Sequence, residues 1–140
     1  MSITNSQDSS ITRRGSCLCE AIKFEVAGPP SVSLICYCKH CRKASSSVGH
    51  YMSVWNQNNF KLIEGDNSLK KFRSYDTESG NPKDRFFCST CGSTIYAITT
   101  SFASDAYYVR TALLDGPLTK ELYPTLEYYT EQKPEFFKLV

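Results

Sequence analysis

The chain has 140 residues, which suits one domain and is short for two. Lysine and arginine number 16 against 14 aspartates and glutamates, so the charge is too even for a dedicated nucleic-acid or anionic-membrane binder. No segment approaches the roughly 20 apolar residues that a membrane-spanning helix needs. These features favour a globular domain that binds neither nucleic acid nor membrane.

The first twelve residues are polar and contain no apolar stretch of the kind found in a secretory signal. We therefore expect a flexible N-terminal tail over residues 1–12, a single domain over residues 13–140, and a cytoplasmic location. In a reducing compartment, grouped cysteines bind metal or take part in chemistry more often than they form disulfides. The total of seven cysteines is odd, which excludes complete internal pairing.

From residue 22 onward the sequence predicts many short strands and little helix. Alternation of apolar and polar residues or short apolar runs mark the strand candidates Ile22–Val26, Val32–Ile35, His50–Trp55, Phe60–Ile63, Leu69–Tyr75, Arg85–Phe87, Thr94–Ile98 and Tyr107–Leu114. One or two helical turns are expected near Lys39–Ser45, and turns at residues 78–83 and 115–117. The apolar residues of the segment 133–140 should pack on the body. The expected fold class is mainly β, with antiparallel sheets and few short helices.

All seven cysteines fall into three clusters with the spacings CxC, CxCxxC and CxxC: Cys17 and Cys19; Cys36, Cys38 and Cys41; and Cys88 and Cys91. Thiolates one or three positions apart on a turn can reach one tetrahedral ion at about 2.3 Å. Gly92 follows the last pair and suits the tight turn of a metal knuckle. The grouping predicts metal binding, most simply of zinc.

The spacing alone leaves two divisions of the cysteines open. Cys38 and Cys41 with Cys88 and Cys91 would form one CxxC…CxxC site and leave three cysteines over. In the other division the first and last clusters form a closed Cys₄ site and the middle cluster a Cys₃ site. A Cys₃ site keeps one metal position open, and its thiolates favour a soft ligand such as a substrate sulfur. This second division points toward chemistry on a thiol or thiol adduct.

The three clusters with their neighbours resemble the signatures of the glutathione-dependent formaldehyde-activating enzyme family. The matching segments are Gly15–Cys19, Cys36–Ser45, Phe87–Ser93 and Val109–Asp115. They extend over nearly the whole domain, and the ordered triple is specific. The family includes a centromere-associated animal relative, centromere protein V, and fungal proteins found near secondary-metabolism genes.

The resemblance implies an Mss4-like fold, with twisted antiparallel sheets built around zinc. It also implies two Zn²⁺ sites: structural zinc on Cys17, Cys19, Cys88 and Cys91, and catalytic zinc on Cys36, Cys38 and Cys41. The founding activity is the condensation of formaldehyde with glutathione to S-hydroxymethylglutathione, classed as a carbon–sulfur lyase. Glutathione or another small thiol is therefore the expected partner, and a related tailoring reaction in secondary metabolism is the expected variant.

This sequence departs from the family pattern at three positions near the cysteines. Glu20 replaces the glycine that usually follows the first cluster, Tyr37 stands where the second cluster often has histidine, and Ser46 replaces the glycine of a common Ser-Gly-Ser. None of the three is a cysteine. Each changes the surroundings of a cluster.

Four further residues have both a functional and an ordinary interpretation. His40, inside the CxCxxC loop, is a candidate proton carrier in catalysis or a solvated loop residue. Arg42 and Lys43 suit an anionic substrate or are ordinary surface charges. Arg110 faces either solvent or a site, whereas His50, at the start of a strand, is expected to be structural.

The leading interpretation is a zinc-dependent carbon–sulfur lyase-like enzyme acting on a thiol–carbonyl adduct, in which His40 or a metal-bound water moves the proton. The alternative is a non-catalytic, zinc-stabilised protein-interaction module, since Mss4-like folds also serve as scaffolds. Redox sensing by the middle cysteine cluster is a third interpretation, and it predicts zinc loss and disulfide formation under mild oxidant.

Overall fold

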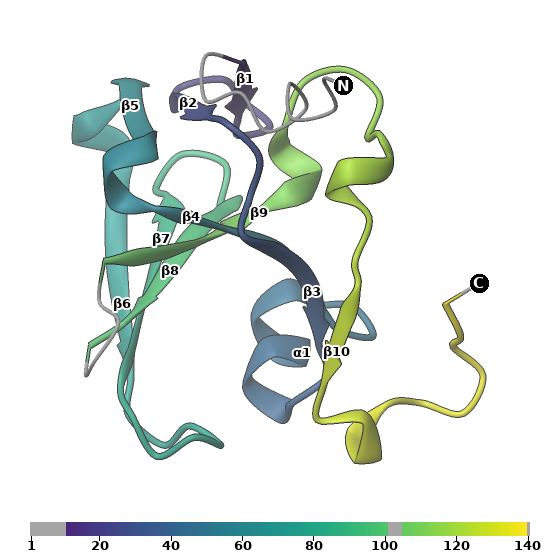
Figure 1. Ribbon diagram of the computed structural model, residues 1–140. Helices are drawn as coiled ribbons and strands as arrows, with labels where there is room; N and C mark the ends of the chain where they lie inside the picture. The colour runs from purple at the N-terminus through teal and green to yellow at the C-terminus, as the bar shows by residue number, and fades with distance from the viewer. Residues whose placement is uncertain (1–10, 101–104, 140) are drawn as a thin grey trace, which may run out of the picture.

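The computed structural model describes residues 11–100 and 105–139. Ten strands, one helix and several short 3₁₀ turns make up this part of the chain, so the fold is mainly β as predicted (Figure 1). The strands are β1 (Thr12–Ser16), β2 (Lys23–Ala27), β3 (Val32–Cys36), β4 (His50–Asn56), β5 (Phe60–Glu64), β6 (Leu69–Ser74), β7 (Lys83–Cys88), β8 (Thr94–Thr99), β9 (Ala106–Arg110) and β10 (Leu126–Tyr128). The helix α1 (Lys39–Ser45) connects β3 to β4.

The strands form two sheets. A small sheet has the order β1-β2-β5, and a larger one has the order β10-β3-β4-β9-β8-β7-β6. All pairs are antiparallel except β10 with β3, which is parallel. In Figure 1 the small sheet lies at the top, and α1 lies in the lower half beside β3. Within the described residues, no helix has the length and apolar character that a membrane crossing requires.

The main hydrophobic core is built from one face of each sheet. Ile22, Phe24 and Val26 alternate with half-exposed residues along the β2 segment and are completely buried. Trp55 and Val109 come from the large sheet and belong to the same cluster. Period-2 alternation places every second side chain of a strand on this face, so the other face of the large sheet remains available for a site.

Most strand predictions are confirmed, with one correction in the chain's last third. The predicted strand Tyr107–Leu114 is wrong beyond its first half, because β9 ends at Arg110 and residues Thr111–Leu113 form a 3₁₀ turn. Strands β1 and β10 have no counterpart among the predicted strands. Residues 1–10 of the expected tail lie outside the described residues, while Thr12 already pairs with Ala27.

The C-terminal segment packs on the body only in part. The Phe137 ring meets the ring of Tyr37 edge-on at a centroid distance of 6.2 Å. Phe136, which was expected to pack as well, is 80% exposed.

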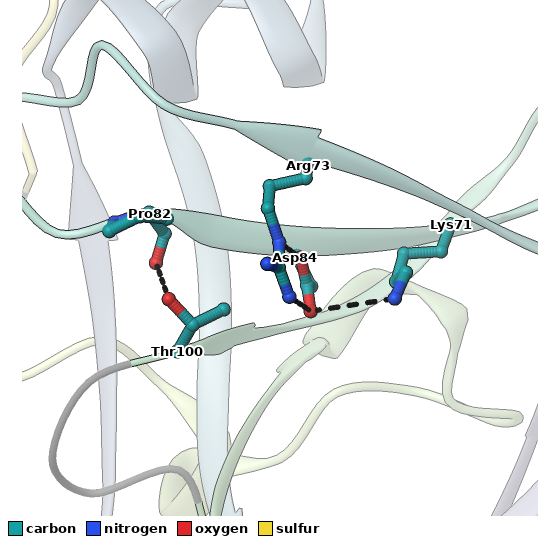
Figure 2. A network of polar contacts seen from close by, with 5 residues as sticks. All are labelled: Lys71, Arg73, Pro82, Asp84 and Thr100. Carbon is teal, nitrogen blue, oxygen red and sulfur yellow. Dashed lines mark hydrogen bonds and ion pairs between the residues drawn. The ribbon is translucent and has the colours of Figure 1, made fainter.

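A buried carboxylate joins the two strands at one edge of the large sheet (Figure 2). Asp84 on β7 is buried, and it accepts hydrogen bonds from Arg73 Nε at 2.7 Å and Nη2 at 3.0 Å. Lys71 Nζ lies 4.0 Å from the same carboxylate. The hydrogen bonds from Arg73 hold the pKa of Asp84 below its usual range. This pair therefore fastens the edge strand β6 to β7.

Replacing Asp84 by asparagine should lower the urea midpoint of unfolding. A lowered carboxyl pKa contributes stability that is complete above the unfolded value of about 3.9 and is lost as the pH falls through the folded value. We therefore expect the difference between wild type and Asp84→Asn to be equal at pH 6 and pH 8. The control is Asp115→Asn, which changes an exposed carboxylate with no ion-pair partner among the described residues. A difference that shrinks between pH 8 and pH 6 would contradict this assignment.

Candidate metal centre

Four cysteines from two distant parts of the chain form the first sulfur group. Cys17 and Cys19 lie in the loop after β1, Cys88 ends β7, and Cys91 lies in the turn before β8. Their Sγ atoms all lie within 4.8 Å of one another. Neighbouring sulfurs are 3.7 Å apart for Cys17–Cys19 and 3.8 Å for Cys19–Cys88. A tetrahedron with metal–sulfur bonds of about 2.3 Å has edges of about 3.8 Å, so this donor set fits a zinc ion.

Backbone and hydroxyl donors surround these sulfurs. The N–H groups of Thr90 and Cys91 donate to Cys88 Sγ at 3.3 and 3.5 Å. The turn closes through Gly92, whose φ is +80° and whose N–H donates to the Cys88 carbonyl at 2.8 Å. A hydrogen bond with the Ser93 hydroxyl at 3.2 Å lowers the pKa of Cys91 to about 5. These contacts favour the thiolate form that a metal requires.

Glu20 lies in a backbone conformation that usually takes glycine. It follows Cys19 directly and has a φ of +65°. Its N–H donates to the Cys17 carbonyl at 3.0 Å, which closes the turn carrying both cysteines. A non-glycine residue in this region meets a steric penalty between its Cβ and the backbone. The glycine expected from the family pattern would avoid this penalty.

The change Glu20→Gly should stabilise the protein by up to about 1 kcal/mol, because relief of the Cβ contact exceeds the extra freedom gained by the unfolded chain. Thermal unfolding of the zinc-loaded protein measures this. Glu20→Ala is the matched control, since it removes the carboxylate but keeps the Cβ, and it should leave the midpoint nearly unchanged. Equal gains in both variants would assign the effect to the charge instead.

The second sulfur group is local in sequence and lies at the start of α1. Cys36 ends β3, Cys38 is the N-cap of α1, and Cys41 lies in its first turn. All three are buried, and their sulfurs lie within 4.8 Å of one another. The N–H of Cys41 donates to Cys38 Sγ at 3.4 Å. Hydrogen bonding from the Cys36 and Cys41 thiols holds the pKa of Cys38 far below its usual range.

The seven sulfurs are thus grouped as four and three. The alternative division, in which Cys38 and Cys41 join Cys88 and Cys91, is wrong because these residues belong to different groups. A cavity of about 200 Å³ opens beside the group of three and is lined by both Cys36 and Cys38. The group of four supplies a complete tetrahedral donor set, with Cys19 exposed, whereas the group of three is buried and borders a cavity.

The lining of this cavity comes from the second face of the large sheet. Cys36 lies opposite His50 and Leu34 opposite Met52 in the register of β3 and β4, and Lys83 lies opposite Thr99 in that of β7 and β8. The further lining residues are His40, Thr77, Glu78, Ser79, Asn81, Arg85, Tyr108, Tyr128 and Tyr129. Facing residues of neighbouring strands share one side of a sheet, which explains why side chains distant in sequence meet here.

The cationic side chains of the cavity are Lys83 and Arg85 rather than those singled out in the sequence. Neither has a carboxylate within salt-bridge distance in the described part of the chain. Of the predicted pair, Arg42 and Lys43 are both exposed, and neither lines this cavity. Sequence reasoning missed Lys83 and Arg85. No local sequence motif marks these two residues, because only the pairing of β7 with β8 brings them to the cavity side of the large sheet.

The two histidines and Arg110 all have buried nitrogen atoms that make no hydrogen bond with the described residues. His40 lines the cavity, and its Nδ1 is buried and makes no hydrogen bond among the described residues. His50 is buried at the start of β4, where burial lowers its pKa to about 3. Arg110 points inward, with its Nε buried, and burial lowers its pKa. Of the three, only His40 lines the cavity itself.

Tyr37 lies between two cysteines of the group of three but does not line their cavity. It is completely buried, and its hydroxyl donates to Glu127 Oε2 at 2.5 Å. Lys133 Nζ lies 3.2 Å from the same carboxylate and 5.5 Å from the centre of the Tyr37 ring. Tyr37, which stands where the family pattern often has histidine, thus connects the C-terminal segment to the cysteine loop through its hydrogen bond to Glu127.

Tyr37→Phe should loosen the segment from residue 126 to residue 137 without releasing metal from the group of three. The reason is that the ring remains while Glu127 loses its hydroxyl donor. We expect faster hydrogen exchange in this segment and unchanged zinc content. Tyr123→Phe, which removes an exposed hydroxyl, is the control. Zinc loss in Tyr37→Phe would show instead that the hydroxyl supports the metal centre.

The fold and the two sulfur groups define a mainly β protein whose cysteines are arranged to hold soft metal ions. The sequence from residue 12 to residue 132 matches the model of the glutathione-dependent formaldehyde-activating enzyme family, and the chain belongs to this family. A Rhodobacter sphaeroides protein of known crystal structure is similar in fold, with a TM-score of 0.60 and 18% identity over 81% of this chain and 98% of that chain. A search of curated proteins found no match.

Proposed function

We propose that this chain is a zinc-dependent enzyme of the carbon–sulfur lyase type that acts on a thiol–carbonyl adduct in the cavity beside Cys36, Cys38 and Cys41. The observation that carries the proposal is the asymmetry of the two sulfur groups. Four sulfurs complete a tetrahedral site, whereas three leave one position, and a cavity opens beside these three. Formation of S-hydroxymethylglutathione is the default reaction, and tailoring of another thiol adduct is its variant.

Zinc held by the three thiolates would favour a substrate sulfur as its fourth ligand and lower the pKa of that thiol. The protein's own residues supply orientation and proton transfer. Lys83 and Arg85 carry positive charge and have no carboxylate partner among the described residues, so they suit a carboxylate of a glutathione-like substrate. Tyr108 and Tyr129 line the cavity and help to confine the bound substrate.

In the forward direction a carbon–sulfur bond forms between the substrate sulfur and the carbonyl carbon. The thiol proton is transferred to the carbonyl oxygen, which becomes a hydroxyl group, and in the reverse direction the same bond breaks. His40 is placed to carry this proton, because it lines the cavity and its Nδ1 makes no hydrogen bond with the described residues. No oxidant or reductant is needed in either direction.

Separate replacement of one cysteine in each group tests this division of roles. Cys38→Ser should bind one zinc ion instead of two, remain folded and lose activity toward glutathione and formaldehyde by about 100-fold or more. Serine is also a good N-cap, so α1 keeps the acceptor that Cys38 supplies. Cys88→Ser should lose the zinc that ties the β1–β2 loop to the β7–β8 turn, and it should unfold.

The measurements are zinc content by elemental analysis, thermal unfolding, and turnover in a screen of thiol–aldehyde pairs. Equal unfolding in both variants would contradict the separation into a structural and a catalytic site. Full zinc loading without turnover of any adduct would favour the non-catalytic interaction module.

A further inference from the structure

A second pocket lies on the other side of His40 from the cysteine cavity. It has a volume of about 530 Å³ and lies between α1 and the strands β6 and β7. Its lining includes Lys39, His40, Lys43, Phe72, Arg85 and Phe87, but none of the seven cysteines. His40 and Arg85 also line the cysteine cavity, so these two side chains form the shared wall. The proposed reaction does not use this pocket.

Arg85 is the feature that points to a ligand. It is only 8% exposed, yet its guanidinium has no carboxylate within salt-bridge distance among the described residues. Its guanidinium reaches the pocket surface, where it can pair with a carboxylate or another oxyanion that enters, the partner that a largely buried arginine usually has. Asp84, its neighbour in sequence, is already paired with Arg73 and faces the opposite side of the sheet.

The rest of the pocket limits the kind of anion. Lys39 and Lys43 are one turn apart on α1, and no acidic side chain lines the pocket. Phe72 lies directly opposite Arg85 in the register of β6 and β7 and is 61% exposed. Exposed aromatic rings beside cations suit a flat apolar body that carries a negative group at one end.

We propose that this pocket binds a planar organic anion of the aryl carboxylate class. The carboxylate pairs with Arg85, Lys39 and Lys43 add long-range attraction, and the ring system packs on Phe72 and Phe87. Arg85 offers the planar fork that matches both oxygens of a carboxylate. This pocket contains none of the seven cysteines and shares only the side chains of His40 and Arg85 with the cysteine cavity, and binding of the anion here does not depend on the proposed reaction.

The test is calorimetric titration of the zinc-loaded protein with 2-naphthoate, and with 2-naphthamide as the neutral analogue of the same shape. We expect saturable binding of the naphthoate. The amide should bind at least about tenfold more weakly. Phe72→Ala and Lys43→Gln change exposed residues that should not disturb folding, and each should weaken naphthoate binding several-fold. Arg85→Gln should abolish it if the variant remains folded.

Three matched variants locate the bound anion. Arg42→Gln removes an equal charge from the same helix outside the pocket, and Phe136→Ala removes an exposed ring elsewhere, so both should bind as wild type does. Lys83→Gln removes a cation that lines only the cysteine cavity, and it should also bind normally. A loss of binding in Lys83→Gln but not in Lys43→Gln would overturn the proposal. So would equal affinity for the amide, or no binding at all.

Discussion

The convergence of four sulfurs from the two halves of the chain is the constraint on which this fold depends. Cys19 and Cys88 are 69 positions apart in sequence, and their sulfurs are 3.8 Å apart. Cys17 and Cys19 lie in the loop that follows the first strand of the small sheet, whereas Cys88 and Cys91 lie at the end of β7 and in the turn before β8 of the large one. A metal ion at this point would close a long loop and fix the two sheets against each other. The unfolded chain would then lose more conformational freedom than through any local contact.

The other sulfur group has the opposite character. Its three cysteines lie within six consecutive residues, so loop closure contributes little to bringing them together. They lie at the junction of β3 and α1, on the face of the large sheet that the small sheet does not cover. These three cysteines do not connect distant parts of the chain; they border a cavity. The cavity forms because the pairing of β4, β9, β8 and β7 brings Lys83 and Tyr108 to the same face of the sheet as Cys36.

The sequence predicts features that depend on local patterns and misses those that depend on pairing. The alternation in residues 22–26 and the cysteine spacing are local, and they led to β2 and to metal binding. Strand β1 has the sequence TRRGS, and only its pairing with β2 makes it a strand. The spacing also left two cysteine divisions open, because it contains no information about which turns meet. Arg85 was missed for the same reason, since its place beside His40 follows from strand order alone.

The three departures from the family pattern now have a physical interpretation. Glu20 and Ser46 both have positive φ angles, 65° and 56°, where the pattern has glycine. They therefore affect backbone strain in the turns beside the two sulfur groups. Tyr37 points away from the cavity toward Glu127. None of the three lines the cavity beside Cys36 and Cys38. The side chains that would contact a ligand in this cavity are instead the lining residues, among them Thr77, Glu78, Ser79 and Asn81 between β6 and β7.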